Sequence, residues 1–271
     1  MKSTEEAYFD HIMAREPDLE GWRLRVQKPE PPQPGSELAD DDAIFPYSPI
    51  SEAVRISLTS AGEHLRLAMT TLKARQLYPV AHFTTLRTAL LAASQGVYIL
   101  GPDDPRERRS RGLAVVVEAY KRLRQYHQDM LSAPDVTESE KQQLSDQIAW
   151  VGQRLEAARK AGADDKVIAT KVISSAAKIV YGTEPDKEHA VNLFWRHLSG
   201  DAHALLWSVG LRSTVAAAEK GQLLGSATAG GSFQAIAQPF EASFQILKRG
   251  WSLYDQRSET PKKSTGGSIY L

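Results

Sequence analysis

The strongest constraint on the fold is a spacing of apolar residues by three and four positions that recurs from Ser51 to about residue 257. The first stripe with this spacing is formed by Leu58, Ala61, Leu65, Met69 and Leu72. An α-helix repeats every ~3.6 residues, so residues at these intervals share one face. No run in this region alternates convincingly between apolar and polar residues, and the sequence contains no Asn-Gly or Asp-Gly hairpin signal. The pattern therefore predicts an all-α fold.

Start and stop signals divide this region into seven predicted helices. The second begins at Pro79 and ends at Gly101-Pro102, and Asp103-Asp104-Pro105 then provides an N-cap and a first-turn proline for the third. The others are predicted to begin at a capping box from Thr137, at Asp164-Asp165, at Pro185-Asp186 and after a Gly/Ser/Ala-rich stretch from Gly221 to Gly231. The helix from Pro185 is expected to continue past His203. Helices joined by short loops indicate a helical bundle of about six to seven helices.

The start of the chain differs from the rest. The chain is interpreted as three parts: an N-terminal arm (1–50), a helical bundle domain (51–257) and a disordered tail (258–271). Six prolines lie between Pro29 and Pro49, and since proline fixes φ and lacks an N–H donor, this segment is predicted to be irregular. Residues 4–14 predict a short helix, whereas the alternation in residues 22–26 indicates an extended segment. We expect the arm to lie on the bundle; the alternative is a Pro-rich peptide that binds a partner.

The composition excludes several kinds of site. The chain has no cysteine, which excludes disulfides, zinc–thiolate sites and cysteine nucleophiles. Its 33 basic and 33 acidic residues give a formal net charge of zero, which disfavours a duplex-DNA binder that depends on an overall positive field. No apolar run approaches the ~18 residues of a membrane span, and the N-terminus carries acidic residues rather than an apolar signal segment. These features predict a cytoplasmic protein with no membrane partner.

The zero net charge conceals a segregation of charge along the chain. The arm contains Asp40-Asp41-Asp42, whereas the start of the third predicted helix carries a basic cluster. This basic cluster consists of Arg106, Arg108, Arg109 and Arg111. It is a candidate surface for RNA or for a protein partner, and a solvated helix start is the simpler interpretation.

Common catalytic and cofactor motifs are absent from the sequence. There is no G-x-x-x-x-G-K-[ST] phosphate loop, no dinucleotide fingerprint, no G-x-S-x-G elbow and no H-E-x-x-H metal motif. No cofactor and no metal ion is therefore predicted. Histidines remain as candidates for proton transfer. Structural or surface roles are expected for His11, His64 and His82, which lie in or near apolar helical segments without an obvious partner.

One predicted helix has a polar face that combines an arginine, a serine and a histidine. At ~100° per residue, Arg196, Ser199 and His203 fall on one face, opposite the apolar stripe. His197 and Asp201 lie on the flank at a spacing of four and could form a hydrogen bond. A guanidinium can bind a phosphate through two hydrogen bonds, an imidazole can transfer a proton near neutral pH, and Ser199 could orient it. The alternative is a structural face that packs on the arm, with His203 hydrogen-bonded to the backbone.

The arrangement Arg196-His197 followed by His203 resembles the motif of the HEPN superfamily of helical domains, in which an arginine and a polar residue precede a histidine. Leu86-Arg87-Thr88-Ala89-Leu90 and Ile99-Leu100-Gly101-Pro102 are also similar to segments of uncharacterised actinobacterial helical proteins. The resemblance implies a bundle that often dimerises across the motif helix. Active members of the superfamily are metal-independent endoribonucleases, often in toxin–antitoxin or phage-defence systems, and many others only bind nucleotide or RNA.

The resemblance also implies a role for each matching residue. Arg196 would bind the scissile phosphate, His203 would act as acid and base, and His197 would be the polar helper. The first hypothesis is therefore a homodimeric HEPN-like endoribonuclease or an RNA- or nucleotide-binding module. The second is a non-catalytic helical interaction or regulatory module that uses the basic cluster. The third is a bundle metalloprotein in which His197, Asp201 and a histidine from another helix hold the metal.

Overall fold

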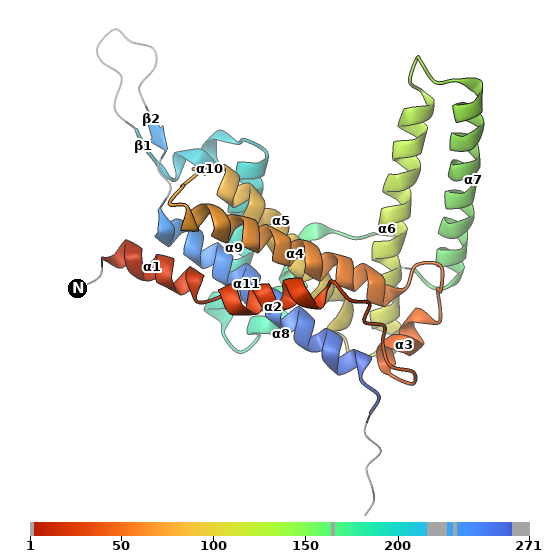
Figure 1. Ribbon diagram of the computed structural model, residues 1–271, viewed down its shortest axis with the longest axis horizontal. Helices are drawn as coiled ribbons and strands as arrows, with labels where there is room; N and C mark the ends of the chain where they lie inside the picture. Colours follow the sequence, from red (N-terminus) through yellow and green to blue (C-terminus); the bar gives the residue numbers. More distant parts are fainter. Residues whose placement is uncertain (1–2, 164–165, 216–226, 230–231, 262–271) are drawn as a thin grey trace, which may run out of the picture.

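The computed structural model describes residues 3–163, 166–215, 227–229 and 232–261, and these residues form an all-α fold, as the sequence predicts (Figure 1). All seven helices predicted for the body are present: α4 (Ile50–Lys73), α5 (Ala81–Leu100), α6 (Pro105–Leu131), α7 (Glu138–Lys160), α8 (Ala169–Tyr181), α9 (Pro185–Ala202) and α11 (Phe233–Ser258). The described residues also include four shorter helices: α1 (Thr4–Met13), α2 (Glu16–Arg25), α3 (Glu37–Asp42) and α10 (Leu206–Gly210). Two short strands pair antiparallel: β1 (Ser213–Val215) and β2 (Ala227–Ala229). They were not predicted, since strands of 3 residues are too short to leave an alternating pattern.

Helix α5 lies at the centre of the bundle. It packs against α4, α8, α9 and α11, and the main hydrophobic core forms where these helices meet. Helices α4, α5 and α11 approach each other closely where Gly96 and Gly250 both face the fully buried Leu58. A Cβ atom at Gly96 would lie 2.6 Å from Leu58 Cδ2, and one at Gly250 would lie 2.5 Å from it. The two glycines therefore allow the three helices to approach each other.

The N-terminal arm packs into the same core and is more helical than predicted. Helix α1 confirms the short helix expected over residues 4–14. The extended segment predicted over residues 22–26 is wrong, because these residues form the end of α2 and its C-cap. Leu19, Trp22 and Val26 are spaced by three and four, and all of them contact the main core. Here the helical spacing outweighs the alternation of apolar and charged residues.

Helix boundaries agree with the sequence where the capping signals are local. Thr137 and Glu140 form the predicted capping box at the start of α7. Asp104 caps α6, accepting a hydrogen bond from the backbone N–H of Arg106 at 2.9 Å. Both signals lie within four residues of the helix end that they define, so no tertiary contact is needed for them to act.

Other boundaries differ from the prediction. Helix α9 ends at Ala202, so His203 is its C-cap rather than a residue inside the helix. Helix α8 begins at Ala169, and the start predicted at residues 164–165 lies outside the described residues. The same is true of residues 262–271 of the predicted tail and of most of the stretch from Gly221 to Gly231.

Helices α6 and α7 form a long hairpin that stands out from the body (Figure 1). A second, smaller core joins the two helices and includes Leu113, Val117, Val151 and Leu155. No helix in the described ranges has both the length and the apolar content that crossing a bilayer requires.

The glycine contacts make opposite predictions for two helix-interior glycines. Gly250→Ala is expected to destabilise the protein by about 1–3 kcal/mol, because the new methyl group collides with buried Leu58. Gly152→Ala in α7 is the matched control: no neighbouring atom lies within 4 Å of a Cβ there, so alanine should stabilise by about 0.5–1 kcal/mol. Urea unfolding of both variants measures the two changes. Equal stability of the two variants would contradict the close packing at Leu58.

Candidate functional site

The candidate catalytic residues lie at the C-terminal end of α9. Arg196 and His203 are exposed, whereas His197 and Ser199 are partly buried. The backbone N–H of His203 donates to the carbonyl oxygen of Ser199 at 3.1 Å, so helical spacing continues to residue 203. Arg196, Ser199 and His203 therefore keep the spacing of three and four that places them on one side of a helix. The exposure of Arg196 and His203 also means that the arm does not bury this side.

A second arginine, from α5, joins this side of α9. The Nε of Arg87 donates a hydrogen bond to the Ser199 hydroxyl at 3.2 Å. The same guanidinium lies over the ring of Trp195, 4.7 Å from its centroid. Arg87 stands in the segment that carries the resemblance, but nothing local in the sequence indicated that α5 lies beside α9. We call Arg87, Arg196, Ser199 and His203 the α9 face.

Two members of the α9 face are free to meet a ligand. Within the part of the chain that the structure describes, the side chains of Arg196 and His203 make no hydrogen bond or ion pair. Ser199 is engaged by Arg87, and its predicted orienting role toward His203 stays a prediction. The α9 face thus presents two guanidinium groups and one imidazole at a solvent-accessible helix end, which is a set of groups suited to an anionic ligand.

His197 is part of a buried polar arrangement rather than of the exposed face. Its ring stacks between Phe83 and Trp207, with centroid distances of 6.1 and 6.0 Å. Arg212 Nη1 lies 2.8 Å from His197 Nε2. Because a guanidinium only donates, this nitrogen accepts the hydrogen bond, and the carbonyl oxygen of Ser208, 3.2 Å away, is then a contact without a shared proton.

The sequence suggested a hydrogen bond between His197 and Asp201. In the structure the guanidinium of Arg212 donates to both residues instead. Asp201 is buried, and Arg212 donates to both of its carboxylate oxygens, at 2.9 and 2.5 Å. A guanidinium therefore lies where the metalloprotein hypothesis needs a metal ion. Among the described residues no group of three or more His, Cys, Asp or Glu side chains is placed to hold a metal.

Of the histidines outside this helix, His82 has a structural position. It is buried, its Nδ1 accepts a hydrogen bond from the backbone N–H of Tyr78 at 3.0 Å, and its Nε2 lies 2.8 Å from Thr71 Oγ1. Burial lowers the pKa of His82, although the carbonyl oxygen of Tyr78, 3.2 Å from Nδ1, partly opposes the shift because it can accept a hydrogen bond from the protonated ring. His11 is different: its Nε2 lies 3.1 Å from a carboxylate oxygen of Glu241, a partner 230 residues away that no local pattern could indicate.

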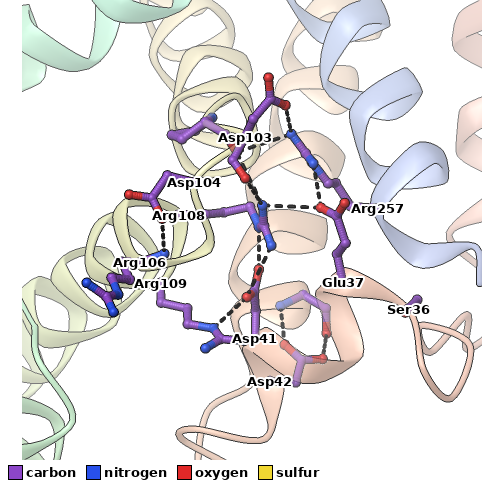
Figure 2. Close-up of polar contacts among 12 residues, drawn as sticks. Ser36, Glu37, Asp41, Asp42, Asp103, Asp104, Arg106, Arg108, Arg109 and Arg257 are labelled. Atoms are coloured by element: carbon purple, nitrogen blue, oxygen red, sulfur yellow. Dashed lines mark hydrogen bonds and ion pairs between the residues drawn. The ribbon is translucent and has the colours of Figure 1, made fainter. Parts of the chain in front are cut away.

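The basic cluster on α6 meets the acidic residues of the arm (Figure 2). Arg108 is only 1% exposed, and its guanidinium is paired with Asp41, which is fully buried. Arg109 Nε also donates to Asp41, at 2.8 Å. Arg108 further contacts Glu37 at 3.2 Å. The charge segregation of the sequence is therefore neutralised within the molecule.

A third arginine extends this network to the C-terminal helix. Arg257 of α11 pairs with Glu37 of α3 and with Asp103 at the start of α6, the latter at 2.6 Å (Figure 2). We call the set Glu37, Asp41, Asp103, Arg108, Arg109 and Arg257 the ion network; Asp41, Arg108 and Arg257 are buried in it, whereas Glu37 and Asp103 are exposed to solvent. It joins three helices that are far apart in the sequence.

The basic cluster is therefore mostly engaged inside the chain. Arg108 and Arg109 belong to the ion network, and Arg111 donates to the carbonyl oxygen of Tyr98 at 2.9 Å. Arg106 alone of the four is exposed.

Comparisons of the chain with protein-family models, with curated proteins and with solved structures give no match.

The buried pair of Arg108 and Asp41 in the ion network makes a prediction for stability. Arg108→Met removes the main partner of the buried Asp41 carboxylate and is expected to cost about 3–5 kcal/mol. Arg122→Met is the matched control on the same helix: Arg122 pairs with Glu118 at the surface, 2.8 Å away, and its loss should cost less than about 1 kcal/mol. Chemical denaturation followed by circular dichroism measures both. A loss for Arg108→Met no larger than that for the control would show that the pair contributes little.

Proposed function

We propose that this protein binds RNA at the α9 face and cleaves it without a metal ion, as the HEPN resemblance implies. The observation that carries the proposal is the hydrogen bond between Arg87 and Ser199, because it brings a second arginine beside Arg196 and His203. Two guanidinium groups can bind the non-bridging oxygens of a phosphodiester in a bidentate manner. The exposure of Arg196 and His203 leaves them accessible to a polymer.

The proposed chemistry uses the 2′-hydroxyl of RNA as the nucleophile. His203 takes the proton from this hydroxyl while its oxygen attacks the adjacent phosphorus. The bond between phosphorus and the 5′-oxygen breaks, the leaving oxygen takes a proton from water, and His203 gives its captured proton to the hydroxide that this leaves. The products are a 2′,3′-cyclic phosphate and a 5′-hydroxyl. Arg196 stabilises the negative charge that develops on the phosphoryl oxygens. DNA lacks the 2′-hydroxyl and would bind without being cleaved.

Arg87 and His197 support this arrangement in different ways. Arg87 is held by the Ser199 hydroxyl and by the ring of Trp195, so its guanidinium is ordered before RNA binds. His197, fixed between two aromatic rings and hydrogen-bonded to Arg212, acts as a positioning residue for the end of α9. A homodimer across α9, which the resemblance also implies, would cover the neighbouring Leu206, which is 90% exposed.

A non-catalytic interaction module is the second candidate, and one observation favours it. The α6–α7 hairpin stands out from the body (Figure 1) and exposes large side chains, among them Tyr126, Met130 and Trp150. Aromatic residues and methionine are enriched in protein interfaces. In this alternative the hairpin, rather than the basic cluster, would contact the partner.

The proposed activity predicts RNA cleavage that resists chelation. A single-stranded RNA incubated with the protein in EDTA should be cut, and Arg196→Ala and His203→Ala should each lower the rate by about 100-fold or more. Arg122→Ala, an exposed arginine on α6, is the control and should cleave at the wild-type rate. Cleavage by either α9 variant at the wild-type rate would exclude the assignment of that residue.

Measurements of RNA affinity distinguish the proposed role of the two arginines in binding from that of His203 in catalysis. Arg87→Ala and Arg196→Ala should each weaken RNA affinity by about tenfold, because a charge-assisted hydrogen bond is lost, whereas His203→Ala should bind nearly as wild type does. Fluorescence anisotropy with labelled RNA measures these affinities. RNA binding that depends on both arginines, without cleavage by the wild-type protein, would support a binding module instead of a nuclease.

A further inference from the structure

A cavity of about 600 Å³ lies between α1, the end of α8, α9 and α11. It uses residues of α9 that do not belong to the α9 face, including Lys187, Val191 and Phe194. Its size falls in the range of small-molecule sites, about 300–1,000 Å³. The RNA proposal leaves this cavity without a role.

The carboxylate of Glu241 in this cavity is already satisfied by the protein. Arg15 donates to both of its oxygens at 2.9 Å, and His11 Nε2 lies 3.1 Å from one of them. Gln245 donates a further hydrogen bond at 2.7 Å. Burial alone would raise the pKa of Glu241, but these hydrogen bonds and the charge of Arg15 lower it. Glu241 is thus ionised, neutralised by its neighbours and unavailable to a ligand.

The polar groups of the lining that remain available can all donate a hydrogen bond: the hydroxyls of Tyr8 and Tyr181, the side-chain amide of Gln238 and the ammonium group of Lys187. Tyr181 lines the cavity, and no partner for its hydroxyl is found among the described residues. Burial, together with the negative charges of Glu241 and Glu184, raises the pKa of Tyr181 to about 12, so the hydroxyl keeps its proton at neutral pH. Lys187 adds an ammonium group at the rim, where its only carboxylate partner in the described residues is the exposed Glu184.

The rest of the lining is mostly apolar. Val191 is buried, Tyr8 and Phe194 are partly buried, and Ala190 and Ala237 complete the wall. Such a wall favours a hydrocarbon body, at about 25 cal/mol per Å² of apolar surface removed from water. A negatively charged head is complementary to the hydroxyl and the ammonium group, because each can donate to it.

We propose that this cavity binds a small amphipathic carboxylate, with its apolar body against Val191 and Phe194 and its head at Tyr181 and Lys187. The site is independent of the RNA proposal, since the two share no residue. Glu241 and His11 line the cavity, and the contacts of Glu241 with His11 and Arg15 fix α1 and the start of α2 against α11.

Isothermal titration calorimetry of the full chain tests the proposal with two probes, octanoate and 1-naphthoate. At least one of them should bind saturably, and 1-octanol should bind about tenfold more weakly than octanoate, because its head carries no charge. Absence of saturable binding by both carboxylates would overturn the proposal. Equal affinity for octanoate and 1-octanol would overturn the assignment of the head.

Substitutions in the cavity test whether the carboxylate binds there. Ala190→Trp fills the cavity and should abolish binding, whereas Ala149→Trp on the exposed surface of α7 is the matched control and should leave it unchanged. Lys187→Gln should weaken octanoate by about fivefold to tenfold and leave 1-octanol nearly unaffected, whereas Tyr181→Phe should weaken both, because the hydroxyl can donate to either head. These two variants decide the question if Ala190→Trp does not fold. Wild-type affinity in both would place the ligand elsewhere.

Discussion

The buried ion pair between Asp41 and Arg108 determines how α3, near the N-terminus, and α11, near the C-terminus, pack against α6. An ionised carboxylate that is buried without a partner destabilises the folded state, because its desolvation costs several kcal/mol. Asp41 therefore requires both Arg108 and Arg109, and the buried guanidinium of Arg257 in turn requires Glu37 and Asp103. These demands are met only when α3, α6 and α11 dock together in one arrangement. Hydrophobic packing brings helices together without direction, whereas this network specifies their register.

The same network changes how the charges of the chain bear on function. The arm cannot leave the bundle as a free peptide without exposing its core residues Ile12, Leu19 and Leu38 and separating Asp41 from Arg108. In the basic cluster of α6, Arg108 and Arg109 pair with Asp41, and Arg111 donates to a backbone carbonyl, so these side chains are engaged within the molecule. Arg106 stays exposed, and at the end of α9 the side chains of Arg196 and His203 have no hydrogen-bonding or ion-pairing partner among the described residues. The proposed anion-binding surface is therefore on α9 rather than on α6.

How far the sequence predicts this protein depends on the range of the interaction. Capping at Thr137 and Asp104 acts within a single turn and was predictable. The shared side of Arg196 and His203 follows from helical spacing alone, and so it too could be derived. Arg87 and Ser199, in contrast, are 112 residues apart, and only the packing of α5 on α9 brings them together. The end of α2 was misread because alternation and helical spacing coincide over five residues, and burial decides between them.

The hairpin of α6 and α7 has a consequence for how the protein opens. Its small core, formed around Val151 and Leu155, is separate from the main core, and α7 has its principal contacts with α6. A segment with its own core and few contacts to the body behaves as a separate cooperative unit, with an opening free energy below that of global unfolding. The amide hydrogens of α7 would exchange with solvent through this local opening while the ion network and the central helix α5 stay closed. The hairpin is therefore expected to have a lower local stability than the bundle to which it is attached.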